Sequence, residues 1–353
     1  MQTRIYRLWI HFCTFDIKRN PKKRPQLSAF IPYKEHKHYT PPSNNDSQKD
    51  QKTLIFEDNK IALDCDFKPD GVSERTFVRV GKVFGCLGLF KDKLGAVLVV
   101  ITSCEAEVNL SGATIYQVKS IELHHVFKQR FSHFDFLKRL QKFFEDGSFY
   151  FSYHMDLSLS RQRYHQHSLS DDQYFWNRNL LTDFYEAYVP KTFYVEVIRG
   201  FVQFQTLWAS GVGLISRTSC RRAGTRFLTR GINDEGFVAN FVETEQILEN
   251  NDNITSFCQI RGSVPLFWEQ KGLNLGRHKI QFSRSLEAML PAFKKHFSHL
   301  NSVYGPVMCV NLLGGKDAEK MLSVAYEEYI VLYSLKVGFF YNFILRGNLL
   351  NSA

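Results

Sequence analysis

The chain has 353 residues, of which 44% are hydrophobic and 23% are charged. This length allows about two domains with a substantial core, and the composition argues against wholesale disorder. The sequence contains no run of about 18 apolar residues, so no transmembrane helix is expected. Seven cysteines without a Cys-x-x-Cys pair indicate reduced thiols rather than a disulfide framework or a zinc site.

The first segment, residues 1–53, is predicted to be a basic, disordered arm. It holds 11 Lys and Arg against 4 Asp and Glu, and so carries most of the net charge of +10. Residues 41–53 are polar and lack apolar periodicity. The run Lys22–Arg24 is either a lipid-surface or nuclear-targeting patch or part of a solvated tail. The remaining residues lack the basic stripe expected of a nucleic-acid-binding protein.

Residues 54–188 are predicted to form a β-rich domain that contains one helix. Apolar side chains three to four residues apart predict the helix over residues 131–146, and Gly147 ends it. Continuous or alternating apolar residues predict strands at 94–102, 115–123 and 149–153.

Residues 189–330 are predicted to form a second domain. Strands are predicted at 194–199, 212–217, 237–244, 255–261 and 307–313. A helix is expected to end at Gly305, and another to run from Asp317 to about Tyr329. Because a strand, a glycine turn and a helix follow one another at the end, the predicted fold class is α/β, or α+β overall. Residues 331–353 are predicted to be an apolar tail, either an amphipathic anchor or a mistaken coding sequence.

Arginines are concentrated in one stretch of the second domain. Five of them fall within 14 positions, next to glycines: Arg217, Arg221, Arg222, Arg226 and Arg230. The planar guanidinium suits bidentate phosphate binding, and glycine allows close backbone approach. Glu243 and Glu245 follow on one face of a predicted strand and could instead neutralise these arginines. The sequence leaves phosphate binding and structural pairing open.

Cys220 and Arg226 have the Cys-x5-Arg spacing of cysteine phosphatases. In such enzymes a low-pKa thiolate attacks phosphorus while loop amides and the arginine hold the phosphate. The stretch has one glycine, no Ser or Thr after the arginine, and a bulky Phe227 in that place, so it is interpreted as a chance match. The pairs His296/His299 and His165/His167 have no acidic or cysteine partner nearby in sequence, so no metal site is expected.

Taken together, a series of ordered strings resembles the Sac-domain phosphoinositide phosphatases. The resemblance covers about residues 76–330. Its strings are FWN at 175–177, RAGTR at 222–226, RG at 230–231, ANFVETEQ at 239–246, FCQIRGSVPLFWEQ at 257–270 and VNLLG at 310–314.

The resemblance implies a β-rich N-terminal subdomain followed by a cysteine-phosphatase-like α/β catalytic subdomain. It implies hydrolysis of phosphatidylinositol phosphates, chiefly at the 4-phosphate, through a phosphocysteine and without a metal or other cofactor. It also implies a cytoplasmic, peripheral location on anionic membranes and endocytic partners. The matched residues expected to bind phosphate or to form the structural signature are Arg222, Arg226, Arg230, Asn240, Glu243, Glu245, Arg261 and Trp268.

The chain departs from the family pattern at one decisive place. The family nucleophile lies in a Cys-x5-Arg loop well after the VNLLG strand, whereas here the match is expected to stop after Ile330 and the apolar tail begins. The chain is therefore predicted to be an inactive, incomplete phosphatase domain. The alternative is a non-catalytic short form that binds membranes or a partner protein.

Overall fold

The structure is a computed structural model with two compact units. The first unit comprises Lys18–Leu159 and Leu169–Phe204, and the second comprises Met1–Ile17, Ser160–Ser168 and Gln205–Ala353. The residues that the structure describes are 29–32, 37–39, 53–57, 60–64, 77–81, 83–92, 95–110, 112–125, 134–166, 171–207, 210–225, 229–250, 253–271, 279–311, 313 and 317–337.

Eight strands form an antiparallel sheet in the order β13-β12-β11-β10-β9-β8-β7-β6. Their bounds are β6 Gly85–Asp92, β7 Gly95–Leu110, β8 Ala113–His125, β9 Phe149–Phe151, β10 Ile198–Leu207, β11 Ser210–Thr218, β12 Val242–Asn250 and β13 Asn253–Arg261. Short pairs lie outside it: β1 (Ala29–Pro32) with β5 (Phe77–Gly81), β2 (Lys37–Tyr39) with β3 (Thr53–Glu57), β3 with β4 (Lys60–Asp64), and β14 (Trp268–Lys271) with β15 (Lys279–Phe282). The structure thus places strands β1 and β2 within the arm that was predicted to be disordered.

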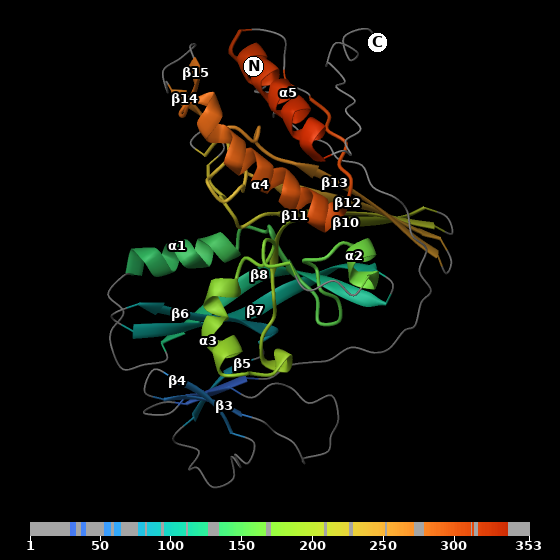
Figure 1. Ribbon diagram of the computed structural model, residues 1–353. Helices are drawn as coiled ribbons and strands as arrows, with labels where there is room; N and C mark the ends of the chain where they lie inside the picture. Colours follow the sequence, from blue (N-terminus) through green and yellow to red (C-terminus); the bar gives the residue numbers. More distant parts are fainter. Residues whose placement is uncertain are drawn as a thin grey trace. The chain divides into compact units, whose positions relative to one another are not determined.

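The core of the first unit explains the apolar run predicted at 94–102. Residues 96–101 of β7 are all buried. Helix α1 (Phe134–Phe144) contributes to the apolar cluster on one face of the strand, and helix α3 (Thr182–Glu186) contributes to the cluster on the other face (Figure 1). The odd-numbered Val99 and Ile101 pack with Phe144, and the even-numbered Leu98 and Val100 pack with Phe184. A strand covered on both faces reads as a continuous apolar run.

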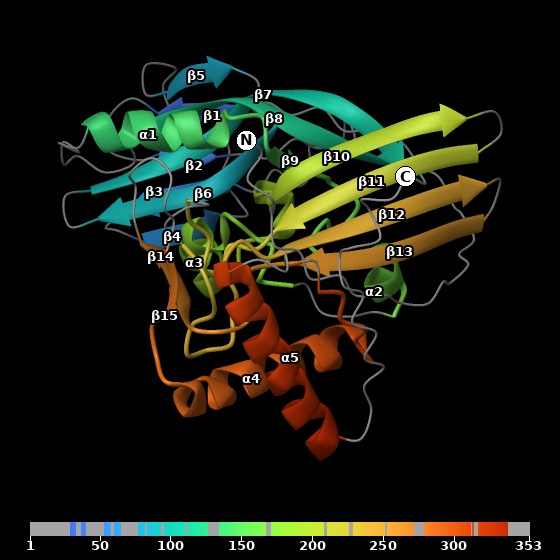
Figure 2. The same cartoon turned by 90° about the horizontal axis from the view of Figure 1, so that it is seen from above.

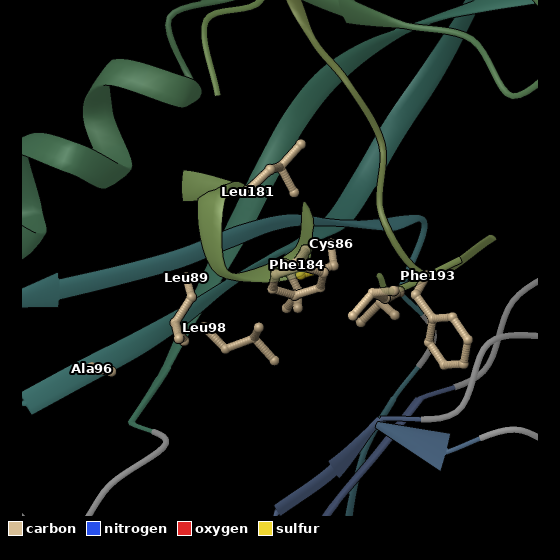
Figure 3. Packing of buried hydrophobic residues seen from close by; sticks show 10 residues of the cluster. Cys86, Leu89, Ala96, Leu98, Leu181, Phe184 and Phe193 are labelled. Atoms are coloured by element: carbon tan, nitrogen blue, oxygen red, sulfur yellow. The ribbon is translucent and has the colours of Figure 1, made fainter. Parts of the chain in front are cut away.

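Figure 3 shows the cluster under α3, in which Leu89 and Leu98 of β6 and β7 lie near Leu181 and Phe184. Both Leu181 and Phe184 are fully buried. Burying a side chain of this size contributes roughly 1.5–3 kcal/mol relative to leaving it exposed. The remaining short helical elements are η3 (Arg178–Leu180) and η4 (Lys191–Phe193) in the first unit and α2 (Arg161–His165) in the second.

In the second unit, helices α4 (Leu286–Tyr304) and α5 (Asp317–Val337) cross each other (Figure 2). The ring of Phe293 lies 5.3 Å from that of Tyr329, and the Tyr329 hydroxyl donates to the carbonyl of Leu286. α4 ends at Gly305, as predicted, where φ is +75°. α5 continues past the predicted end near Tyr329, so residues 331–337 are helical.

Most elements match the sequence predictions, and the α+β class is confirmed. Three predicted strands are wrong in whole or in part. Residues 194–197 and 237–241 lie outside the strands, although Val238 forms a single bridge with Ile232, and the described residues 307–311 are not part of a strand. Alternating apolar side chains indicate that one side of a segment is buried. A strand also requires hydrogen bonds to the backbone of a neighbouring strand. The α/β unit predicted around 307–329 is therefore absent from the described residues, whose strand pairs in the large sheet are antiparallel.

Candidate functional site

A buried ion network lies on the inner face of β11 and β12. Arg217 stands opposite Glu243 in the strand register, and its side chain is 1% exposed. Its guanidinium donates to Glu243 Oε1 at 3.0 Å and to Glu245 Oε2 at 2.7 Å. Because side chains alternate along a strand, the two glutamates share one face, as the sequence predicted.

The remaining carboxylate oxygens of the network bind groups from other elements. Glu243 Oε2 accepts from Arg163 of α2 at 2.8 Å and from the hydroxyl of Tyr304, the last residue of α4, at 2.5 Å. Glu245 Oε1 accepts from the hydroxyl of Ser256 and from the backbone N–H of Arg161, both at 2.6 Å. The four carboxylate oxygens therefore each accept at least one hydrogen bond.

The electrostatics of Arg217 follow from this arrangement. Burial disfavours the charged guanidinium, but the carboxylates of Glu245 and Glu243 outweigh burial and raise the pKa of Arg217 above its usual range. The glutamates therefore neutralise Arg217 inside the unit. The ion pairs between Arg217 and the two glutamates have the geometry that the structural alternative expects.

Two further signature arginines hold a loop together. Arg222, at φ +48°, donates to the carbonyls of Arg230 at 2.7 Å and Gly231 at 3.3 Å. The side chain of Arg230 donates to Gln270 at 3.1 Å and lies 5.4 Å from the ring centroid of Trp268.

Two residues fix the backbone of the same loop. Gly231 has φ +64°, and a Cβ atom there would lie 2.4 Å from the carbonyl oxygen of Leu266, so only glycine fits. Asn240, at φ +53°, directs its amide to the carbonyl of Thr229 at 3.4 Å. These signature residues shape the loop between β11 and β12.

The other signature residues fall into different surroundings. Arg261 ends β13 opposite Val242, and Arg226 lies outside the described residues. Arg221 is exposed, with its guanidinium 5.4 Å from the ring centroid of Phe237.

Cys220 follows the end of β11 and enters a turn rather than a helix. The described residues 221–225 and 229–241 contain no helix. A phosphate loop uses backbone amides, commonly at a helix N-terminus, to hold the anion. A second Cys-x5-Arg, Cys13 with Arg19, was missed in the sequence analysis and lies outside the described residues.

Comparison with known proteins decides the family. The sequence model of the family described as "SacI homology domain" matches residues 84–339, which is more than half of the chain. The chain belongs to the SacI homology domain family. The matched residues extend beyond Ile330, where the resemblance was expected to stop, and include all of α5.

Relatives of this SacI homology domain are much longer proteins. Synaptojanin-1 of Homo sapiens is 37% identical over 294 residues, which is 79% of this chain and 19% of the relative. Synaptojanin-2 of Rattus norvegicus is 39% identical over 78% of this chain and 19% of the relative. The polyphosphatidylinositol phosphatase INP53 of Saccharomyces cerevisiae is 40% identical over 57% of this chain and 20% of the relative. The chain thus spans about one fifth of the length of these relatives.

In the first unit of the SacI homology domain, Asn177 of the FWN string has a role that the sequence did not reveal. Its side chain is fully buried. The amide Nδ2 donates to the carbonyls of Leu87 at 2.9 Å and Val195 at 2.7 Å, and Oδ1 accepts from the N–H of Val197 at 3.0 Å. Reasoning from sequence also missed Arg163, Tyr304 and Ser256 as members of the ion network, because nothing in their local patterns indicates it.

No group of three metal-ligating side chains occurs among the described residues, and none of the described helices is long and apolar enough to cross a membrane. His296 is buried, and its Nδ1 lies 2.9 Å from the carbonyl of Gly236. The ring of His299 contacts that of Phe237 at 6.0 Å. Both histidines therefore have packing roles in this part of the structure.

Because His296 is buried, we expect the free energy of unfolding to depend on pH. Burial lowers the pKa of His296 to about 4, from an unfolded value of about 6.5. The unfolded chain therefore takes up a proton first, and this residue's contribution to stability falls as the pH drops from about 6.5 to 4. In urea titrations over this range, His296→Gln should flatten the decline in unfolding free energy, whereas substitution of the exposed His154 by Gln should not. Equal slopes for both variants would contradict the assignment.

Proposed function

We propose that the protein functions among the phosphoinositide phosphatases, which remove phosphate, chiefly the 4-phosphate, from phosphatidylinositol phosphates on cytosolic membrane surfaces. Membership of the SacI homology domain family carries the proposal. It is supported by relatives whose names include polyphosphatidylinositol phosphatase and inositol-1,4,5-trisphosphate 5-phosphatase. In the proposed reaction a thiolate attacks phosphorus and water releases phosphate from the phosphocysteine.

We further propose that these 353 residues do not perform this reaction by themselves. Arg217 is buried between two carboxylates, and Arg222 and Arg230 direct their guanidinium groups to partners within the chain. Cys220 is followed by a turn. Among the described residues, no helix begins next to Cys220 that would stabilise its thiolate form. The signature arginines then act by shaping the loop between β11 and β12.

The purified chain should release no phosphate from short-chain phosphatidylinositol 4-phosphate above the blank. Cys220→Ser should leave this result unchanged, because the thiol has no catalytic part in the proposal. Phosphate release measured by a dye assay is the readout, and thermal unfolding shows that both proteins are folded. Turnover that Cys220→Ser abolishes would instead identify Cys220 as a nucleophile.

The second candidate function is a non-catalytic module that binds anionic membranes. The basic residues 1–53 favour it, since each cation near an anionic surface contributes about 1 kcal/mol. Co-sedimentation with liposomes distinguishes the two candidates. Binding that depends on acidic lipid and weakens with salt, without any phosphate release, supports the module, while binding independent of both conditions counts against it.

A further inference from the structure

An extended segment of the first unit, residues 194–197, has the alternation of a strand without being part of a ladder. Val195 and Val197 are buried, whereas Tyr194 and Glu196, which alternate with them, are only half-buried. Tyr194 has the backbone angles of a strand, with φ −139° and ψ 162°. The strand predicted here from the sequence is thus extended, and the assigned strand β10 begins only at Ile198.

One backbone edge of this segment is bonded to its own unit. The N–H of Val195 donates to the carbonyl of Cys86 at 3.0 Å, and the carbonyl of Val195 accepts from Asn177 Nδ2. The N–H of Val197 donates to Asn177 Oδ1, and its carbonyl accepts from the N–H of Trp176 at 3.0 Å. Alternate residues of an extended chain direct both main-chain groups to the same side.

The other edge belongs to Tyr194 and Glu196. Neither residue makes a main-chain hydrogen bond to any residue in the described part of the chain. A row of unpaired N–H and C=O groups is a template for another strand. The segment therefore has the hydrogen-bonding capacity of an edge strand.

A pocket of about 380 Å³ lies against this edge, and both Tyr194 and Glu196 line it. Its buried lining residues are apolar, namely Gly85, Met155, Leu157, Phe175 and Val195. Its charged lining residues are two carboxylates, Asp156 and Glu196, and the ammonium of Lys191, which lies 2.5 Å from Glu196. The pocket can take an apolar side chain, and its formal charges favour a basic ligand over an acidic one.

Tyr188 gives independent support for a ligand at this place. It has φ +52° and is 89% exposed. The N–H of Tyr188 donates to Tyr185 and that of Val189 to Phe184, so Tyr188 occupies the helix-end position that usually holds glycine.

Hydrogen bonds at the helix end hold the backbone of Tyr188, but its side chain makes no hydrogen bond or ring contact within the described residues. Arg222 and Asn240, which also have positive φ, both use their side chains to bond backbone carbonyls. The ring of Tyr188 makes no such contact, and a strained, exposed residue indicates a role outside the fold. Tyr188 lies three residues before Lys191 of the pocket, at most about 11 Å along the chain.

We propose that the edge formed by Tyr194 and Glu196, with its adjoining pocket, binds an extended basic peptide segment of a partner protein by β-strand addition. The peptide backbone exchanges hydrogen bonds with Tyr194 and Glu196, and one apolar side chain enters the pocket over Met155 and Leu157. Backbone bonding supplies affinity in this mode, and the pocket supplies selectivity. This activity is separate from the proposed phosphate chemistry.

The test uses the full chain and a fluorescein-labelled peptide, Ser-Lys-Thr-Val-Thr-Val-Lys-Ser, followed by fluorescence anisotropy. The proposal expects saturable binding. Methylating the alternate backbone nitrogens of the peptide should weaken binding about thirtyfold, because roughly two hydrogen bonds of about 1 kcal/mol each are lost. Replacing both lysines of the peptide by glutamate should also weaken binding. Amide exchange should slow at Tyr194 and Glu196, but not at Val195 and Val197, which are already bonded.

Matched variants locate the site on the protein. Thr192 is an exposed pocket residue, so Thr192→Trp should reduce peptide affinity about tenfold by filling the pocket. Thr182→Trp, at an exposed threonine of α3 outside the pocket, should leave affinity within about twofold. Tyr188→Gly should raise the thermal midpoint, because glycine relieves the strain, and should still weaken peptide binding.

Several results would overturn the proposal. They are equal affinity for the methylated and unmethylated peptides, equal effects of the two tryptophan variants, and absence of binding at millimolar peptide. Binding that appears only after deletion of residues 1–28 would show that the basic arm of this chain, and not a partner, occupies the edge. Phosphatase activity is not a readout here, so this proposal can fail independently of the proposed function.

Discussion

Glu243→Gln should lower the free energy of unfolding by about 3 kcal/mol or more, the usual loss when one partner of a buried ion pair is removed. The glutamate is fully buried and accepts from Arg217, Arg163 and Tyr304. Its replacement leaves a net positive charge inside the second unit, where water cannot compensate it. Urea unfolding at neutral pH is the measurement, with an unchanged slope showing that the unfolded state is not altered.

A matched control lies in the same unit. Asp234 forms an ion pair with Arg284 at the surface, and Asp234→Asn should change stability little, since exposed pairs contribute little. The double variant Arg217→Met, Glu243→Met should recover part of the loss, because it removes one charge of each sign and leaves the buried network without a net charge. Equal effects of Glu243→Gln and Asp234→Asn would show that the network is not a stabilising unit.

Asn177→Ala should destabilise the first unit by about 3 kcal/mol or more, since it leaves the N–H of Val197 and the carbonyls of Leu87 and Val195 buried without a partner, at about 1–3 kcal/mol each. Asn177→Asp should be at least as harmful. It keeps the shape of the side chain but places a carboxylate oxygen against two carbonyls. Thermal and urea unfolding of the full chain measure the effect.

The neighbouring Asn179 provides the control for Asn177. It is exposed, and Asn179→Ala should stay within about 0.5 kcal/mol, as surface substitutions usually do. If Asn177→Asp proved neutral while Asn177→Ala did not, the loss would come from packing volume rather than from hydrogen bonds. The assignment of Asn177 as the bonding centre of this loop would then be wrong.

The elements that local pattern predicted well are those with strong periodicity and clear ends. The helix of apolar spacing before Gly147 is α1, and the helix ending at Gly305 is α4. Residues 194–197 and 307–311 have alternating burial too, yet they are not part of a strand. A strand depends on a backbone edge supplied by residues far away in sequence, which no local pattern contains.

In the candidate site too, features set by neighbouring residues could be predicted, whereas contacts with residues far away in sequence could not. The shared face of Glu243 and Glu245 follows from the two-residue repeat of a strand. Their bonding to Arg163, Tyr304 and Ser256 does not, because these residues are between 11 and 80 positions away in sequence. The sequence left Arg222 and Arg230 either to phosphate binding or to pairing with the glutamates, whereas in the structure they donate to backbone carbonyls and to the side chain of Gln270, respectively.

The sequence by itself determined the family, the α+β class and the order of most elements, since these depend on ordered strings and on side-chain periodicity. The tertiary structure decided which charged groups are buried together, how the turn after Cys220 is built and which edge of residues 194–197 is unbonded. The physical reason is that burial and hydrogen bonding are properties of pairs. Each partner's position is set by the packing of the whole unit, whereas periodicity is a property of one segment alone.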